Sequence, residues 1–165
     1  MHLTYEKTYA IIAKKERVIL LENFRPYERR CFYYETDKMS IMHHSNYIRI
    51  FEETRVDFLR QAGKPFEEIE AAGLLMPVLS VSCTFKRPLR FDEPFAVFPV
   101  ITRFNGVTME VSYRIISRES GDICAEGSSS HCFTDNDLKP VRIKKTHPDI
   151  YKVFADRVGM EAISD

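Results

Sequence analysis

A short stretch in the first third of the chain gathers side chains that could carry out acyl transfer. Asp37 supplies a carboxylate, and His43 and His44 follow it just before a predicted long helix. A carboxylate can attack a carbonyl carbon or activate a water molecule. The first turn of a helix leaves backbone N–H groups without partners, and these groups can stabilise a developing oxyanion. This connection therefore holds the parts needed to hydrolyse an activated acyl group.

Simpler interpretations of the same residues stay open at this point. An aspartate before a helix often serves as a cap or a turn residue, and neighbouring histidines are often solvated. A metal site has little support. We expect the rings of His43 and His44 to point in different directions, and no second pair of ligands follows at a useful spacing. The sequence therefore predicts no metal.

One long helix is predicted over residues 46–62. Charged side chains recur there at steps of three or four and form one polar stripe, opposite a broad apolar face. The stripe consists of Arg49, Glu53, Asp57 and Arg60. Ser45 is the expected N-cap of this helix, and Gly63 is the expected residue after its end. A strand rich in aromatic residues is predicted before it, over residues 27–36.

After Gly73 the sequence alternates with a period of two, which indicates strands. Pro99 favours an edge position or a bulge in one of them, and Asn105-Gly106 predicts a two-residue hairpin. Short turns between consecutive strands give an antiparallel meander. The fold class is therefore α+β, with one long helix on a sheet that could curve around it. The strands are predicted near residues 80–86, 95–102, 109–115 and 123–134.

Two short helices are predicted where a proline stands at the start of a helical pattern. The first follows Pro65 and ends near Gly73, and the second opens at Pro148 and ends near Gly159. The second lies in a basic tail, so we expect it on the surface.

Composition limits the class of protein. The chain has 165 residues, a length typical of one domain. Lys+Arg and Asp+Glu both number 24, so the basic excess of a nucleic-acid-binding protein is missing. No secretory signal and no stretch of about 18 apolar residues is present, so we expect a cytoplasmic protein with no membrane span. The four cysteines have no C-x-x-C spacing and are expected as reduced thiols.

The stretch from Tyr34 through the predicted helix resembles the hotdog-fold thioesterases of the 4-hydroxybenzoyl-CoA thioesterase type. That family shows a tyrosine, one or two residues, Thr-Asp, six residues, and then His-x-x-Tyr at the start of the long helix. Thr36-Asp37 and His44 to Tyr47 keep this pattern. Two later segments also resemble the family, namely Phe85-Lys86-Arg87-Pro88 with Asp92, and Ala125-Glu126-Gly127-Ser128 with Lys139-Pro140-Val141-Arg142-Ile143.

The resemblance implies a hotdog fold, in which a curved antiparallel sheet wraps one long central helix. It covers about residues 27–145. We therefore divide the chain into an N-terminal extension of open role (1–25), a hotdog thioesterase domain (26–145) and a C-terminal short helix with a tail (146–165).

The resemblance also implies an activity and its residues. Asp37 would be the nucleophile or general base, and the backbone N–H of His44 would polarise the thioester carbonyl. The His44 side chain would assist with orientation or proton handling, and His43 is a candidate for substrate binding. Family active sites lie between subunits, which implies a homodimer or homotetramer. Many relatives have glycine where this chain has Met39-Ser40.

The expected reaction converts an acyl thioester of coenzyme A, or of acyl carrier protein, to a free acid and a thiol, with no metal or redox cofactor. A hotdog enoyl-CoA hydratase is a rival, although its Asp/His pair usually sits closer in sequence. A non-enzymatic hotdog protein that senses acyl-CoA is another, although it would need a DNA-binding segment and the leader is too short for one.

For a few further residues a structural or solvated role competes with a functional one. Lys86, Arg87 and Arg90 could meet coenzyme phosphates, but a solvated face is at least as good an explanation. His131 is expected as a strand residue rather than a ligand.

Overall fold

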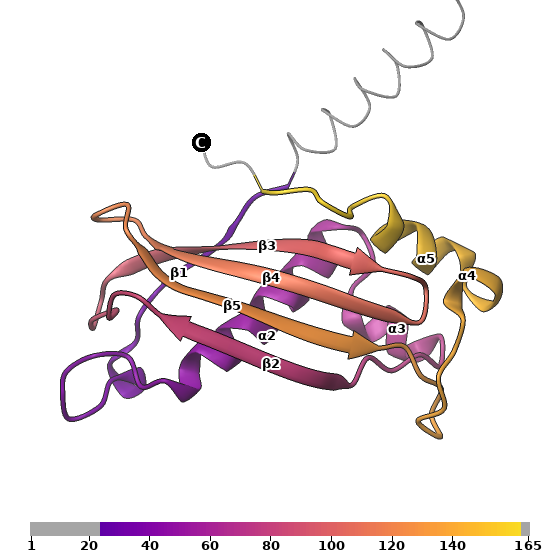
Figure 1. Ribbon diagram of the computed structural model, residues 1–165, viewed down its shortest axis with the longest axis horizontal. Coiled ribbons are helices and arrows are strands. Elements are labelled where there is room, and N and C mark those ends of the chain that lie inside the picture. Colours follow the sequence, from indigo (N-terminus) through magenta and orange to yellow (C-terminus); the bar gives the residue numbers. More distant parts are fainter. Residues whose placement is uncertain (1–23, 163–165) are drawn as a thin grey trace, which may run out of the picture.

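The computed structural model describes residues 24–162, so most of the expected N-terminal extension lies outside the described residues (Figure 1). Within these residues β1 and three helices come first, four consecutive strands follow, and two short helices come last. The elements are β1 (Tyr27–Arg30), the 3-10 helix η1 (Tyr33–Glu35), α2 (Ser45–Gln61), α3 (Phe66–Ala71), β2 (Val78–Phe85), β3 (Pro94–Phe104), β4 (Thr108–Ser117), β5 (Ile123–Cys132), α4 (Ile143–Thr146) and α5 (Pro148–Ala155).

All five strands form one antiparallel sheet in the order β1-β3-β4-β5-β2. Figure 1 shows the sheet in front of α2, which runs obliquely across its inner face, while α4 and α5 cover one end. Within residues 24–162 the predicted α+β class, one long helix and the antiparallel sheet are therefore confirmed. The order leaves β2 as one edge strand.

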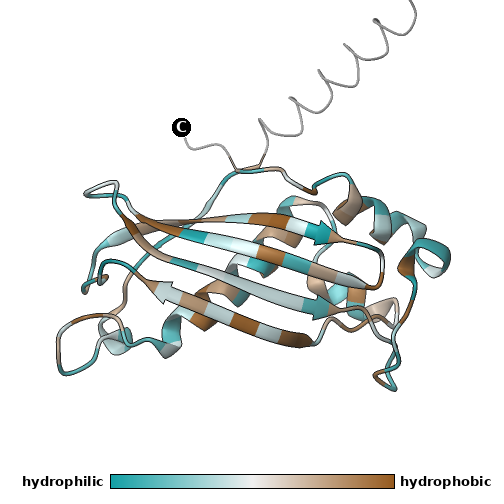
Figure 2. Ribbon diagram, viewed as in Figure 1, coloured by the Kyte–Doolittle hydropathy of each residue, from teal (hydrophilic) through white to brown (hydrophobic). Residues whose placement is uncertain are grey.

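The core lies between α2 and the inner face of the sheet. Phe51 on the helix is fully buried, and its ring stacks on Tyr113 of β4 with centroids 4.3 Å apart. Gly127 of β5 lies directly beneath it, where an added Cβ would come within 2.3 Å of the Phe51 ring. Only glycine lets the helix approach the sheet this closely, so Gly127 sets the spacing of the two layers. Figure 2 shows the hydropathy changing along each strand, as expected for a sheet with one buried face.

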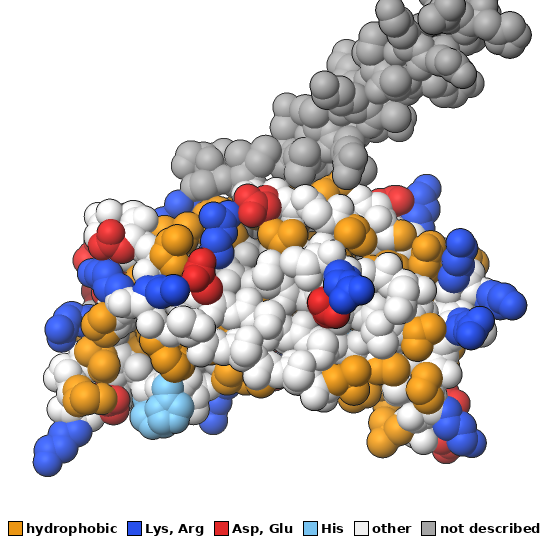
Figure 3. Space-filling model, in the orientation of Figure 1, with side chains coloured by type: hydrophobic (Ala, Val, Ile, Leu, Met, Phe, Trp, Pro, Cys, Tyr) orange, Lys and Arg blue, Asp and Glu red, His pale blue; other side chains and the backbone are white. Residues whose placement is uncertain are grey.

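The outer face of the sheet is polar where β2 and β5 lie side by side. Serine pairs bridge β2 and β5, with Ser80 Oγ 2.6 Å from Ser130 Oγ and Ser82 Oγ 2.8 Å from Ser128 Oγ. Figure 3 shows this face, whose centre carries few hydrophobic side chains. Most buried apolar side chains therefore lie on the side of the sheet that faces α2.

The first strand is shorter than predicted. The expected strand over residues 27–36 ends at Arg30, and η1 replaces its second half. The cause is Glu35, whose carboxylate accepts the backbone N–H of Phe32 at 2.8 Å and pairs with Arg29 at 2.6 Å. These bonds turn the chain inward, so an aromatic-rich segment that favours a strand by composition becomes a tight turn.

The start of the long helix also differs in detail. Ser45 was expected as the N-cap but is the first helical residue, and His44 occupies the cap position. The Ser45 hydroxyl instead lies 2.8 Å from His43 Nδ1. At the other end Gly63 follows the cap with a φ of +73°, as predicted. The position of Ser45 matters because it leaves the cap without a side-chain acceptor.

The hairpin and the proline strand follow the predictions with one change. β1 pairs with β3 only as far as Val97, so within the described residues no strand pairs with Pro99 on the β1 side of β3. A register shift between β3 and β4 follows between Ile101 and Arg103. The Asn105-Gly106 turn contains three residues rather than two, because the Asn105 side chain accepts the N–H groups of Val107 and Thr108.

The C-terminal helix is shorter than expected. It opens at Pro148 as predicted but ends at Ala155 rather than near Gly159. Its inner face is not on the surface either, since Ile150 and Phe154 are buried in the main core.

Candidate active site

The loop that carries Asp37 is a closed turn. Its ends pair through an antiparallel bridge between Thr36 and Met42, and the Asp37 N–H donates to Ile41 O at 2.9 Å. One carboxylate oxygen of Asp37 accepts the Met39 N–H at 2.8 Å. Ser40 has a φ of +58°, in the left-handed region that favours glycine. The chain therefore makes with serine a turn whose backbone conformation glycine adopts more readily.

The start of α2 presents its N–H groups beside this loop. Asn46 N–H donates to His43 O at 3.0 Å, so the first turn begins at His43. In the part of the chain that the structure describes, no group accepts a hydrogen bond from the His44 N–H. This donor is therefore free for a ligand at the positive end of the helix dipole.

Glu35 joins the loop to the helix. Its backbone O accepts two hydrogen bonds, from the His43 N–H at 2.8 Å and from Asn46 Nδ2 at 2.9 Å. Asn46 and the Glu35 side chain are both buried. No pattern in the sequence marked either residue as a candidate. The signal that could have found Asn46 is a buried amide in the first turn of a helix, where it can serve backbone groups of a neighbouring loop.

A network of ion pairs holds the Glu35 side chain in place. Arg29 donates to both oxygens of Glu35, at 2.6 and 2.8 Å, and its Nε donates to Glu53 at 2.9 Å. Burial alone would lower the pKa of Arg29, but the bonds to these carboxylates raise its pKa above the ordinary value. Tyr27 also donates to Glu53, and burial followed by this bond raises the pKa of Tyr27 to about 12. Arg29 therefore stays charged at neutral pH, and its bonds to Glu35 and Glu53 hold η1 on α2.

A pocket of about 310 Å³ opens between the loop, the helix start and the end of β2. Asp37 and His44 both line it, so the structure brings these two predicted residues together. Its walls are mostly apolar and its rim carries two cations. The remaining lining residues are Met39, Ile41, Met42, Tyr47, Phe85, Lys86, Arg87 and Pro88.

His43 is placed beside the pocket and not among its lining residues. Its ring lies against that of His44, with centroids 4.0 Å apart, so the expectation that the two rings point in different directions is wrong. The Nδ1 atom of His43 is 2.8 Å from Ser45 Oγ. These contacts let His43 orient the His44 ring from outside.

The cations at the rim are engaged with carboxylates. Lys86 pairs with Glu126 at 3.3 Å, and Arg87 pairs with Glu93 at 2.5 Å and with Asp122 at 3.5 Å. Arg90 has no carboxylate within ion-pair distance in residues 24–162. Of the three cations considered for phosphate contact, Arg90 therefore has the charge that is not already compensated.

A second polar chain crosses the core at some distance from the pocket. Arg55 donates to the Tyr113 hydroxyl at 3.0 Å, Ser129 Oγ lies 2.8 Å from that hydroxyl, and His131 Nε2 lies 2.7 Å from Ser129 Oγ. His131 is a buried residue of β5, as predicted. Burial and the charge of Arg55 lower the pKa of His131 to about 4, so its imidazole is neutral at pH 7.

The remaining sequence expectations concern the thiols and the membrane. All four cysteines are free, and Cys31, Cys124 and Cys132 are buried. Within residues 24–162 no helix is both long and apolar enough to cross a bilayer.

Comparison with known proteins gives one family and several relatives. A model of the thioesterase-like superfamily matches residues 32–154. An Aquifex aeolicus protein with the provisional name esterase is 36% identical over 126 residues, which cover 76% of this chain and 96% of that protein. A Bacillus subtilis protein provisionally named acyl-CoA thioesterase YneP is 30% identical over 123 residues, covering 74% and 88%. A solved DHNA-CoA thioesterase from Staphylococcus aureus is 24% identical, covers 80% of this chain and 89% of its own, and superposes with a TM-score of 0.75.

Proposed function

The chain belongs to the thioesterase-like superfamily and has the hotdog fold of its thioesterases, and from this premise we propose that it hydrolyses acyl-CoA thioesters with Asp37 and the His44 N–H. The observation that carries the proposal is that Asp37 and His44 line one pocket, and that the His44 N–H has no acceptor among residues 24–162. The relative named as an acyl-CoA thioesterase supports coenzyme A as the thiol part of the substrate.

In the proposed reaction the thioester carbonyl lies between these two groups. Its oxygen accepts a hydrogen bond from the His44 N–H, which stabilises the negative charge that develops there. Asp37 either attacks the carbonyl carbon or takes a proton from an attacking water. The carbon–sulfur bond then breaks, and the products after addition of one water are a carboxylic acid and a thiol. The His44 imidazole serves orientation or proton transfer to the departing thiolate.

We further propose that β2 pairs with β2 of a second copy to form a homodimer, or two such dimers a homotetramer. The outer edge of β2 has no strand partner within the described residues. Its helix-side face exposes apolar side chains, among them Val78 and Val81. An unpaired apolar edge is a template for another strand. Phe85 belongs to the same strand and lines the pocket, so the second copy would complete the wall beside Asp37.

The remaining expectations stay proposals. These are a cytoplasmic location and the division into residues 1–25, 26–145 and 146–165. Residues 26–145 carry the whole pocket, and α5 packs on the same core.

The experiment that tests the activity is a hydrolysis screen over acyl-CoA esters of different chain length and aromatic character, read by release of free thiol. We expect turnover of at least one ester. The variant Asp37→Asn serves as the inactive reference. Binding of acyl-CoA without thiol release would favour the sensing alternative. Addition of water to an enoyl-CoA, with the thioester left intact, would favour the hydratase.

A further inference from the structure

Four aromatic side chains stand exposed next to the candidate active site. Tyr33 and Tyr34 of η1 are 76% and 77% exposed, and Phe91 and Phe32 are 58% and 45% exposed. They form two ring pairs: Tyr33 meets Phe91 edge-on at 5.6 Å, and Phe32 stacks on Tyr34 at 5.4 Å. We name these four residues the aromatic platform. A cluster of exposed rings on one surface marks a binding site more often than scattered apolar residues do.

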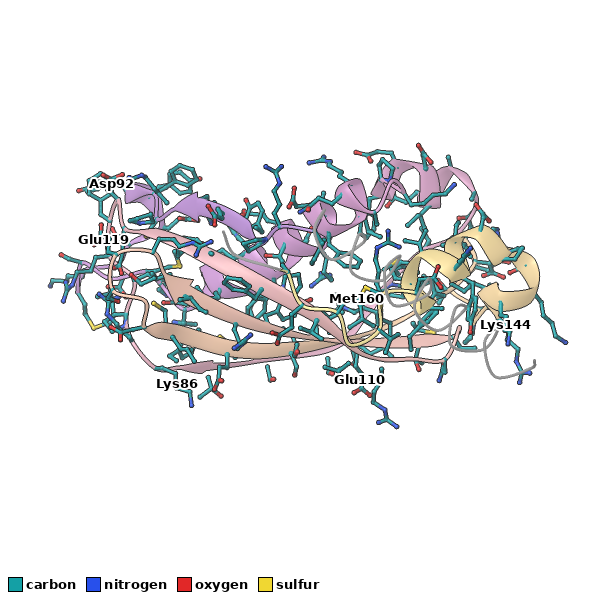
Figure 4. All side chains as sticks on the ribbon, turned by 90° about the horizontal axis from the view of Figure 1, so that it is seen from above. Lys86, Asp92, Glu110, Glu119, Lys144 and Met160 are labelled. Carbon is teal, nitrogen blue, oxygen red and sulfur yellow. The ribbon has the colours of Figure 1, made fainter. Side chains whose placement is uncertain are left out.

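The platform adjoins the pocket through backbone pairing. Arg90 forms an antiparallel bridge with Ile41, and the Met42 N–H donates to Leu89 O at 2.8 Å. Ile41 and Met42 line the pocket, and Phe91 directly follows Arg90. Figure 4 shows Asp92, the next residue, toward the same end of the molecule as Lys86 of the pocket rim. The segment that carries Phe91 is therefore paired with the part of the loop that lines the pocket at Ile41 and Met42.

Contacts with Arg29 and Glu35 hold the Phe32 part of the platform in place. The Arg29 guanidinium lies over the Phe32 ring at 5.0 Å from its centroid, and Arg29 is itself fixed by the bonds to Glu35. The Glu35 carboxylate also accepts the Phe32 N–H. Phe32, Tyr33 and Tyr34 thus sit on a turn that these bonds hold in place, which lowers the entropy lost when a flat ligand stacks on their rings.

Two cations that lie close to the platform and to Asp37 along the chain have uncompensated charge within the described residues. Lys38 follows Asp37 and Arg90 precedes Phe91, and neither has a carboxylate within ion-pair distance in the described part of the chain. Arg30, which is also near, pairs with Asp92 at 3.3 Å. Exposed aromatic rings beside free cations match a ligand with a flat base and phosphate groups.

We infer that the aromatic platform, with Lys38 and Arg90, binds the nucleotide end of the coenzyme A thioester while the thioester lies in the Asp37 pocket. The inference rests on the proposed function and specifies which surface selects coenzyme A. The adenine would stack on the rings, and the phosphates would lie near the two cations.

The test compares two thioesters of the same acyl group, one on coenzyme A and one on N-acetylcysteamine, which lacks the nucleotide. In the variant Tyr33→Ala/Phe91→Ala, we expect the preference in kcat/KM for the coenzyme A ester to fall by about 10-fold, the order expected for loss of one stacked base. Lys38→Gln/Arg90→Gln should reduce the same preference and weaken its dependence on salt. Leu138→Ala, which removes an exposed apolar side chain from another loop, is the matched control and should leave the preference unchanged.

A binding measurement separates this inference from the proposed function. Adenosine 3′,5′-bisphosphate, titrated by calorimetry into the wild-type protein, should bind, and the double alanine variant should bind it at least about 10-fold more weakly. Binding that is lost in the variant supports the platform even if no thioester is hydrolysed. If the wild type binds no bisphosphate, or the variant loses both thioesters equally, the inference is wrong. A change of oligomeric mass in the variant with unchanged preference would instead assign the platform to a contact between copies.

Discussion

The side-chain amide of Asn46 donates a 2.9 Å hydrogen bond to the backbone carbonyl of Glu35, and this bond joins the first turn of α2 to the segment that leads into Asp37. The same carbonyl accepts the His43 N–H, so two donors from the helix start converge on one acceptor. These two bonds, which involve neither Asp37 nor His44, tie the loop before Asp37 to the start of α2.

Asn46→Ala should lower kcat more than it lowers affinity, because it loosens the placement of the reacting groups. We expect a fall in kcat of about 10-fold and a loss of about 1 kcal/mol in the free energy of unfolding. Steady-state kinetics and urea denaturation measure the two effects. Thr54→Ala is the matched control, since it removes another buried bond from the same helix, Thr54 Oγ1 to Ile50 O, away from the pocket. An equal loss of kcat in both variants would refute the positioning role of Asn46.

Asp37→Asn should reduce kcat by at least about 10²-fold, because it removes the charge that attacks the carbonyl or activates water. The fold of the loop should survive, since the asparagine side-chain oxygen can still accept the Met39 N–H as Asp37 does. Thiol release measures the activity, and circular dichroism checks the fold. An active and folded Asn variant would place the chemistry elsewhere.

His44→Ala separates the backbone and side-chain roles of this residue. The N–H remains in the variant, so oxyanion stabilisation should persist, and we expect a drop in kcat of only about 10-fold. Steady-state thiol release measures this drop, and the His44 imidazole is the only group that the variant removes. A loss as large as that of Asp37→Asn would make the imidazole an obligatory catalyst. Full activity would leave His44 with a structural role only.

Val81→Lys tests the proposed pairing of β2 edges. Val81 lies midway along the edge strand and is 42% exposed, so a lysine there places like charges close together across a symmetric contact. We expect a monomer by light scattering at micromolar concentration and a loss of activity with it. Leu138→Lys adds the same charge at an exposed loop position and should keep the wild-type mass. A monomeric wild type would contradict the shared site.

Buried His131 should make the protein less stable in acid. Its pKa is about 4 in the folded chain against an ordinary 6.5, so between these values the unfolded chain binds the extra proton and stability falls as the pH falls. Lowering the pH from 7 to 4.5 should therefore cost the wild type about 2 kcal/mol more than His131→Asn, which cannot titrate. Urea denaturation at both pH values measures this difference. Equal losses in the two proteins would show that His131 is charged in the folded state.

Local patterns in the sequence were enough for most of the elements. The amphipathic stripe of α2 and the alternation after Gly73 show which face of each segment is apolar. Because the fold buries these apolar faces, the two patterns predict the helix and the strands. They failed at η1 and at Ser45, because a salt bridge from β1 and the neighbouring His43 ring outweighed the preferences of those segments.

The sequence by itself determined the class of the fold and one loop that holds Asp37 and His44, since these depend on residues close together along the chain. The tertiary structure alone decided what positions that loop. Arg29, Glu35 and Asn46 meet only after the helix has packed on the sheet, at the distance that Gly127 permits. The same holds for Tyr33 and Phe91, which are far apart in the chain and share one surface because Arg90 pairs with Ile41. Contacts between distant segments depend on the register and spacing of whole elements, and no local pattern encodes these.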